Sequence, residues 1–247
     1  MMELQGRVAL VTGAGQGIGR VFAHAFAAAG AIPIVADRNV PKARAVAEAI
    51  GGEAIEVDVG DPGSVQAMAD SVEARHGRID ILVNNAAIFS TLTMKNFDQI
   101  PLDEWDQVLR VNLTGPFLCA RAVLPAMRRA QWGRIVNIGS GAVTLGRPGY
   151  VHYIASKAAL VGMGRSMARE LGPDGITVNA ILPGATFTEI ERKTVTPDFV
   201  QRIVAQQCVH RPQVPEDLVG ALLFLCSPGA AFVTGQALTV DGGATHP

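Results

Sequence analysis

The feature of this chain that most constrains its fold is the alternation of short apolar runs with longer amphipathic segments. Apolar runs of the kind that form buried strands fall at 8–11, 32–36, 54–57, 79–83, 134–138, 177–181 and 237–240. Segments with helical periodicity fall at 21–29, 41–50, 62–76, 102–129, 153–171 and 215–226. Strands and helices that alternate in this way form right-handed crossover units, which predict an α/β fold with a parallel sheet and helices on both faces.

Length and composition limit the number of domains and the kind of partner. The 247 residues are 49% hydrophobic and 17% charged, which suits one domain spanning 1–247. A formal net charge of -1 without a basic block argues against nucleic acid or an anionic membrane surface, and favours a small molecule. Cys119, Cys208 and Cys226 are too scattered for a disulfide framework or for metal ligands. Without an apolar signal segment or an 18-residue apolar run, the chain is expected to be cytoplasmic and not membrane-bound.

A glycine-rich loop lies between the first apolar run and the first helical segment. It contains Gly13, Gly17 and Gly19, a spacing that differs from G-x-G-x-x-G, whose last glycine would fall at Ile18. Glycines let the backbone approach a pyrophosphate, and a helix amino terminus adds N–H groups and partial positive charge. A tight turn would also explain the glycines, but their place between strand and helix favours a dinucleotide site.

Acidic residues end the second and third predicted strands, where a dinucleotide fold binds adenosine. Asp37 is placed to accept hydrogen bonds from the ribose hydroxyls, although a turn or capping role would also suit it. A 2′-phosphate would be repelled by its carboxylate, so we expect NAD rather than NADP. Arg38 could bind a phosphate, but Gln16 in the glycine loop adds no second cation. Asp58 ends the third strand.

Three polar residues of catalytic type lie close together in the sequence. Ser140 follows the fifth apolar run, so its hydroxyl is expected at the carboxyl end of a strand, where ligands bind in open α/β sheets. Tyr153 and Lys157 are four residues apart and share one face of a helix. A nearby ammonium in a semi-buried cleft can bring the phenol pKa down from about 10, which would let Tyr153 act as a general base. Surface packing would also explain this Tyr–Lys pair taken alone.

Neighbouring residues have competing explanations. Ser156 differs in helical phase from the Tyr–Lys pair and is expected to pack, and the absence of G-x-S-x-G disfavours a serine hydrolase. Tyr150 and His152 either border the cleft or only begin the helix.

Two segments depart from the simple pattern. Asn112 lies inside the predicted helix 102–129, which is expected to bend near Gly115-Pro116, and is either solvent-facing or held there for a function. From 185 to 211 the alternation of strands and helices is lost. Long connections of this kind over a cleft are typically functional lids or disordered segments.

Taken in order, these motifs resemble those of the short-chain dehydrogenase/reductases over essentially the whole chain. Asn84-Asn85-Ala86 is similar to the family's motif after the fourth strand, whereas Ala87 departs from its usual glycine. The catalytic residues implied by the resemblance are Asn112, Ser140, Tyr153 and Lys157. The cofactor-binding residues that it implies are Gly13, Gln16, Gly17, Ile18, Gly19, Asp37, Asp58, Val59, Asn85, Ala86, Tyr153, Lys157, Pro183, Gly184 and Thr188.

The resemblance also implies the architecture and the chemistry. It implies a single Rossmann-like domain with a doubly wound, seven-stranded parallel sheet. Tyr153 would exchange the proton, Ser140 would hold the substrate oxygen, and Lys157 would lower the Tyr153 pKa and bind the nicotinamide ribose. Asn112 would hold a water that relays protons, while Pro183, Gly184 and Thr188 would close over the nicotinamide carboxamide. A homotetramer is expected, paired through the long helices and the edge strand.

Two classes of function fit this reading. The first is an NAD-dependent dehydrogenase of a secondary alcohol or its ketone, with a 3-oxoacyl-carrier-protein reductase as the alternative within the enzyme class. The second is a non-catalytic member of the same fold that binds NAD(H) as a sensor. Retention of all four polar residues favours the enzyme, because a sensor has no need of an acidified tyrosine.

Overall fold

The computed structural model describes residues 4–191 and 195–246, and its core is one seven-stranded parallel sheet. The strands are β1 Val8–Thr12, β2 Ile32–Asp37, β3 Glu53–Glu56, β4 Ile81–Asn84, β5 Gly133–Ile138, β6 Ile176–Pro183 and β7 Ala237–Val240. Their order across the sheet is β3-β2-β1-β4-β5-β6-β7. The order reverses direction between β1 and β4, and ligands of doubly wound sheets bind in the crevice at that point.

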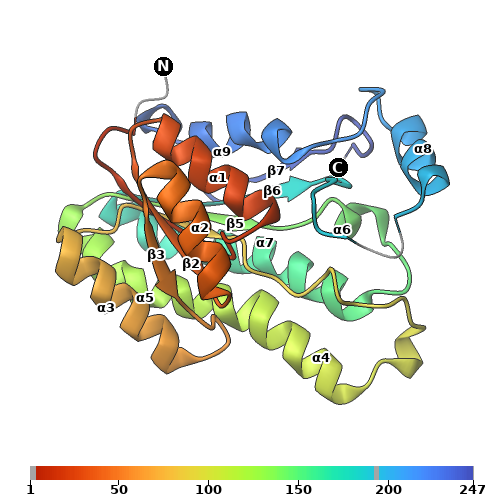
Figure 1. The fold of residues 1–247 in the computed structure, drawn as a ribbon, viewed down its shortest axis with the longest axis horizontal. Helices are drawn as coiled ribbons and strands as arrows, with labels where there is room; N and C mark the ends of the chain where they lie inside the picture. Colours follow the sequence, from red (N-terminus) through yellow and green to blue (C-terminus); the bar gives the residue numbers. More distant parts are fainter. Residues whose placement is uncertain (1–3, 192–194, 247) are drawn as a thin grey trace.

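Helices cover both faces of the sheet (Figure 1). They are α1 Gly17–Ala28, α2 Val40–Ile50, α3 Pro62–His76, α4 Leu102–Leu109, α5 Gly115–Ala130, α6 Ala142–Leu145, α7 Val151–Leu171, α8 Pro197–Gln206 and α9 Val219–Cys226. A π-helical turn spans Arg110–Thr114, and 3-10 turns span Phe97–Gln99, Gly172–Asp174, Pro215–Leu218 and Pro228–Ala230. Among the residues described, no helix combines the length and apolar character needed to cross a membrane.

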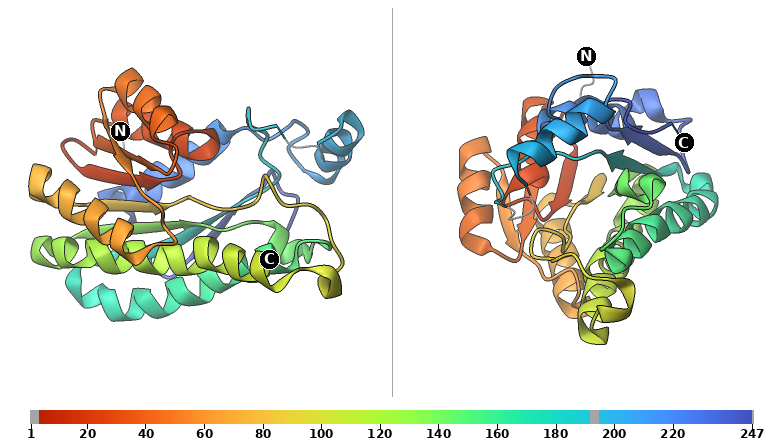
Figure 2. Two further views of the ribbon diagram at one scale, coloured as in Figure 1. Left: turned by 60° about the horizontal axis from the view of Figure 1, so that its bottom comes forward. Right: turned by 90° about the vertical axis from the view of Figure 1, so that its right-hand side faces the viewer.

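Two apolar layers hold the helices to the sheet. On one face, α1, α2 and α9 bury side chains such as Phe22, Phe26 and Leu222 against the strands. On the other face, α3, α5 and α7 bury side chains such as Met68 and Met127. The two views in Figure 2 show these layers, with α8 standing apart at one end of the molecule. The fold class predicted from the sequence, including the doubly wound seven-stranded sheet, is confirmed.

The helix predicted over 102–129 is interrupted by the π-helical turn. The ring of Pro116 has no N–H to donate to the carbonyl of Asn112, four residues earlier. Instead, the N–H of Gly115 donates to the carbonyl of Arg110, five residues earlier. The expected bend at this point is therefore a local widening of the helix, and it places Asn112 in a buried position.

Two other segments differ in detail from the sequence pattern. The 185–211 segment, predicted as a long connection of the lid or disordered type, contains α8, whose amino terminus is capped by Thr196 accepting a hydrogen bond from Phe199 N. The helix predicted over 215–226 begins as a 3-10 turn and becomes α-helical only at Val219.

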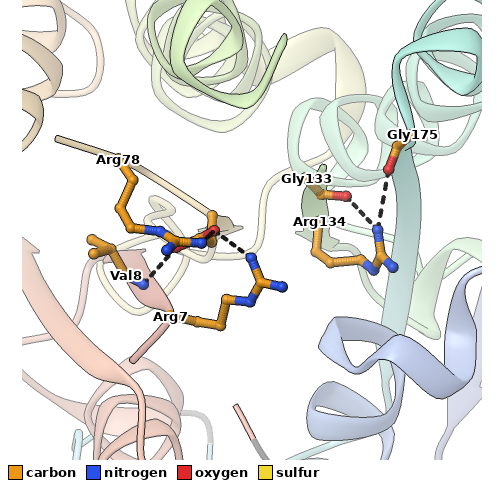
Figure 3. Close-up of polar contacts among 7 residues, drawn as sticks. Arg7, Val8, Arg78, Gly133, Arg134 and Gly175 are labelled. Atoms are coloured by element: carbon orange, nitrogen blue, oxygen red, sulfur yellow. Dashed lines mark hydrogen bonds and ion pairs between the residues drawn. The ribbon is translucent and has the colours of Figure 1, made fainter. Parts of the chain in front are cut away.

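Charged residues are concentrated at the amino ends of the strands, opposite the crevice (Figure 3). Asp80 is fully buried and accepts hydrogen bonds from Arg7, Arg78 and Val8 N. Nearby, the guanidinium groups of Arg7 and Arg134 stack on the ring of Trp132 at 3.9 and 4.4 Å. These contacts join the segments that precede β1, β4 and β5.

Candidate active site

A cavity of about 760 Å³ opens at the carboxyl ends of the strands. It is lined by the glycine loop, the ends of β2, β4, β5 and β6, the start of α7 and part of the 185–211 segment. The sequence-predicted residues that line it are Gly13, Gln16, Ile18, Asp37, Asp58, Val59, Asn85, Ala86, Ser140, Tyr153, Lys157, Pro183, Gly184 and Thr188. Gly17, Gly19 and Asn112 do not line it.

The glycine loop is fixed by close contacts with the segment after β4. A Cβ on Gly13 would lie 2.7 Å from the Cα of Ala86, and one on Gly19 would lie 2.4 Å from the carbonyl oxygen of Gly13. Asn85 donates hydrogen bonds from Nδ2 to the carbonyls of Thr12 and Gly13. Close packing inside the loop therefore requires glycine at position 19. Gly19 belongs to the glycine motif for this reason, although it does not line the cavity.

Asp37 lies at the end of β2, partly buried beside the glycine loop. Its carboxylate accepts hydrogen bonds from Gly15 N at 2.9 Å and from Asn39 N at 2.8 Å. These bonds orient the side chain at the cavity wall, whereas the neighbouring Arg38 is exposed. Lys42 donates to the side-chain oxygen of Gln16, so a cation that the sequence analysis did not consider lies beside the glycine loop.

Ser140, Tyr153 and Lys157 come together at the centre of the cavity. Ser140 follows β5, and its Oγ accepts a hydrogen bond from Ala142 N. The Nζ of Lys157 lies 5.9 Å from the centre of the Tyr153 ring and donates to the carbonyl of Ile138 at 2.7 Å. Burial lowers the pKa of Lys157 to about 8, so the side chain remains largely protonated at neutral pH. Tyr153 and Lys157 are neighbours on α7, as their four-residue spacing predicts, and Ser140 lines the same cavity; the roles of all three stay predictions.

Asn112 is held behind the cavity. Its Oδ1 accepts from Ile88 N at 2.7 Å, and its Nδ2 donates to Ile88 O and to Ser156 Oγ. The side chain thereby connects the segment after β4 to α7, and it is not solvent-facing. Ser156 is also buried and donates to Tyr153 O, which agrees with the packing role expected for it.

A row of aromatic side chains runs from the centre of the cavity to its mouth, and the sequence analysis did not identify it. Phe89 stacks on Tyr153 with ring centres 4.3 Å apart, and Tyr150 lies 5.6 Å from Phe89. The guanidinium of Arg147 is 5.2 Å from the Tyr150 ring. Tyr150 is buried and does not line the cavity itself, but it contacts Phe89 and Arg147, which do, while the buried His152 pairs with Glu104.

The 185–211 segment contacts the glycine loop through Glu189. The N–H of Gly17, in the first turn of α1, donates to Glu189 Oε1 at 2.9 Å, and Arg20 lies 3.3 Å from Oε2. Burial alone would raise the pKa of Glu189. The hydrogen bond from this N–H and the positive charges of Arg20 and Lys42 outweigh that effect, and the pKa is lowered. No sequence pattern linked residues so far apart. Residues 192–194 of this segment lie outside the described part of the chain.

The chain is similar to known proteins along almost its whole length. Residues 13–245 match the family model described as enoyl-(acyl carrier protein) reductase. The 3-oxoacyl-[acyl-carrier-protein] reductase FabG of Escherichia coli K12 is 38% identical over 245 residues, 98% of each chain. The D-threitol dehydrogenase of Mycolicibacterium smegmatis is 39% identical over 251 residues, 98% of this chain and 94% of that protein. A crystal structure described as a short-chain alcohol dehydrogenase from Sinorhizobium meliloti 1021 superposes with a TM-score of 0.91 at 36% identity, covering 98% of both chains.

Proposed function

Because the chain belongs to the short-chain dehydrogenase/reductases, a family of oxidoreductases that bind a nicotinamide cofactor, we propose that it transfers a hydride between NAD and a secondary alcohol or its ketone. The observation that carries the proposal is the meeting of Ser140, Tyr153 and Lys157 in the same cavity as the glycine loop. This arrangement puts a proton donor or acceptor next to the place where a dinucleotide would bind.

The residues of the cavity fit a dinucleotide. Gln16 provides no side-chain cap at the amino terminus of α1, so backbone N–H groups of the first turn other than that of Gly17, which donates to Glu189, suit a pyrophosphate. Asp37 lies at the β2 end of the same cavity, where ribose hydroxyls can donate to it. Asp58 and Val59 line the wall beyond it, and Pro183, Gly184 and Thr188 line the opposite side.

Tyr153 is the proposed general acid and base. During oxidation its phenolate takes the proton of the substrate hydroxyl while Ser140 Oγ hydrogen-bonds the same oxygen. A nicotinamide cofactor, when bound, would provide the hydride acceptor for oxidation and the hydride donor for reduction. The protonated Lys157 favours the phenolate because its buried positive charge lies one helical turn away. Asn112 keeps the segment around Ile88 in place against α7 and so shapes the floor of the site.

NAD is the proposed cofactor because Asp37 faces the expected adenosine position. A 2′-phosphate would bring nearly two negative charges close to this carboxylate. At an effective dielectric constant near 20 the repulsion is about 4 kcal/mol per unit charge at 4 Å. The attraction that opposes it comes from Arg38, which is exposed, and from Lys42, whose ammonium already donates to Gln16.

Reduction of a 3-oxoacyl thioester is the second candidate, supported by the names of the FabG relatives. The first candidate is supported by the names of the D-threitol dehydrogenase and of the Sinorhizobium protein. Measurement of kcat/KM distinguishes the two candidate functions. The value for a 3-oxoacyl carrier-protein thioester is compared with the values for a panel of secondary alcohols and ketones.

A cytoplasmic homotetramer is the proposed form of the enzyme. The three cysteines are unpaired, as expected in a reducing compartment. Phe232, in the segment before the edge strand β7, is fully exposed. Leu238, on β7 itself, is 40% exposed. An uncovered apolar edge favours pairing with another copy. Light scattering at micromolar concentration should give the tetramer mass, and a monomer would contradict this assembly.

Replacement of Tyr153 by Phe tests the proposed chemistry. We expect turnover to fall by about three orders of magnitude or more, because the substitution removes only the transferable proton. NADH binding, followed by fluorescence, should stay nearly unchanged. Activity of Tyr153→Phe near that of the wild type would exclude this mechanism.

Replacement of Ser140 by Ala should lower turnover by about a hundred-fold, since one hydrogen-bond partner of the substrate oxygen is lost.

A further inference from the structure

Arg147 occupies a distinctive position at the mouth of the cavity. It belongs to the loop between α6 and α7 and is partly buried. Its guanidinium lies 5.2 Å from the centre of the Tyr150 ring and 5.4 Å from that of Phe199 on α8. Two aromatic rings from different segments thus hold the planar cation in place, an environment that suits arginine better than lysine.

The positive charge of Arg147 is not compensated within the described residues. Seven other arginines have a carboxylate within ion-pairing distance, namely Arg7, Arg20, Arg75, Arg78, Arg128, Arg129 and Arg211. In the part of the chain that the structure covers, no such partner and no side-chain hydrogen bond is found for Arg147. A half-buried guanidinium therefore offers its donors to whatever enters the cavity.

Apolar residues near Arg147 in the chain and on α8 line the cavity with it. They are Leu145, Pro148, Phe199 and Ile203. The acidic residues of the cavity lie elsewhere or are already engaged: Asp37 and Asp58 end the second and third strands, and Asp241 accepts from Gly243 N, Ala244 N and Thr245. A cation in an apolar wall attracts an anion more strongly than one on an open surface.

The aromatic row relates Arg147 to the proposed reacting atoms. Tyr150 and Phe89 lie between the guanidinium and Tyr153, each ring in contact with the next. A ligand that reached from Tyr153 to Arg147 within the cavity would pass the ring of Phe89, which lines it, while the buried Tyr150 contacts both Phe89 and Arg147. Its oxygen-bearing carbon would lie at one end of a short apolar stretch, and its charged group would lie at the other end.

We propose that Arg147 binds an anionic group of the substrate, a carboxylate or a phosphate monoester, separated by a short apolar chain from the carbon that exchanges the hydride. The proposal rests on the function proposed above and narrows its substrate class to oxo and hydroxy compounds with a remote negative charge. The guanidinium makes two parallel hydrogen bonds to either group, which adds orientation to affinity.

Matched ligands test this proposal independently of turnover. Calorimetry of the enzyme–NADH complex would compare 5-oxohexanoate and 7-oxooctanoate with their neutral methyl esters, and a phosphorylated ω-hydroxy methyl ketone with its free alcohol. We expect the anionic member of at least one pair to bind about ten-fold or more tightly than its neutral partner. The pair that shows the difference distinguishes carboxylate from phosphate. Neutral members that bind as tightly as the anions in all pairs would overturn the proposal.

Variants then locate the effect. Arg147→Gln should remove the preference for the anion and leave binding of the neutral member within two-fold, whereas Arg147→Lys should retain part of it. Arg202→Gln, which removes an exposed cation of α8, should leave the preference unchanged and controls for long-range attraction. A preference that survives Arg147→Gln would overturn the assignment. If the keto acids bind as expected but no ketone or alcohol is turned over, the proposed function fails while the anion site stands.

Discussion

The two ends of the central sheet both bury charge, but they treat it differently. At the amino ends, the carboxylate of Asp80 is fully buried and meets the opposite charges of Arg7 and Arg78, while the buried guanidinium of Arg134 nearby donates to the carbonyls of Gly133 and Gly175. At the carboxyl ends, Lys157 is buried to a similar extent, yet the acceptor observed for its ammonium is the neutral carbonyl of Ile138. Burial accordingly lowers the Lys157 pKa to about 8.

This difference separates a structural cluster from a chemical one. A balanced buried pair contributes little net stability compared with apolar packing, but it becomes costly when one partner is removed. An unbalanced buried cation destabilises the fold and at the same time stabilises any negative charge that develops beside it. The Asp80 cluster therefore serves to join strands, and Lys157 keeps a charge available for chemistry at the carboxyl end.

Removal of Asp80 should give the largest effect on stability. Asp80→Ala leaves the facing guanidinium groups of Arg7 and Arg78 without their carboxylate, and we expect the free energy of unfolding to fall by about 3–5 kcal/mol. Urea denaturation measures the change. Turnover per folded molecule should remain close to that of the wild type, because the cluster lies at the opposite end of the sheet. The control Asp70→Ala removes an exposed acid on α3 and should change stability by less than about 0.5 kcal/mol.

Lys157→Met should behave in the opposite way to Asp80→Ala. We expect it to lose activity and to become more stable than the wild type by an amount that depends on pH. The folded-state pKa of about 8 lies below the unfolded value of 10.5, so the unfolded chain binds more protons between these two values. The destabilising effect of Lys157 is therefore full below pH 8 and disappears as the pH rises to 10.5. Relative to wild type, the variant should be more stable at pH 7 than at pH 10.5 by up to about 3 kcal/mol. A stability difference that does not change with pH would contradict the unbalanced charge.

Asp37→Ala tests whether an acidic residue at the carboxyl ends of the strands determines cofactor preference rather than stability. Because Asp37 is only partly buried and its bonds are to backbone N–H groups, we expect a much smaller loss of stability than for Asp80. The ratio of kcat/KM for NADP to that for NAD should rise by about a hundred-fold, as a repulsive carboxylate is removed. Equal wild-type values for the two cofactors would show that Arg38 and Lys42 outweigh Asp37.

Glu189→Gln should have the smallest effect. The glutamate carboxylate occupies the amino terminus of α1, next to the place proposed for the pyrophosphate. Because the side chain is about half exposed, its neutralisation should lower the Kd for NADH only two- to five-fold. Fluorescence titration measures this, and Glu191→Gln, which alters an exposed acid nearby, is the control. Weaker NADH binding would instead show that Glu189 holds the 185–211 segment over the cofactor.

The sequence by itself determined the features that depend on short-range pattern. Helix α3 has the predicted limits, with Asp61 accepting from Ser64 N at its start and the left-handed Gly77 at its end. Strand β7 also has its predicted limits. The four-residue spacing of Tyr153 and Lys157 was enough to place them on one face of α7, because helical geometry fixes such neighbours without reference to the rest of the chain.

Only the tertiary structure decided the contacts between distant segments. Glu189 meets Gly17 across 172 residues, and Asn112 meets Ile88 across a π-helical turn. Arg147 meets Phe199 of the distant α8, whereas Tyr150 belongs to its own loop. Local propensity acts over a few residues, whereas these contacts depend on how strands, helices and loops pack once the sheet has formed. The chain's periodicity therefore predicted its framework and the neighbouring positions of Tyr153 and Lys157, whereas packing set the charges that surround them.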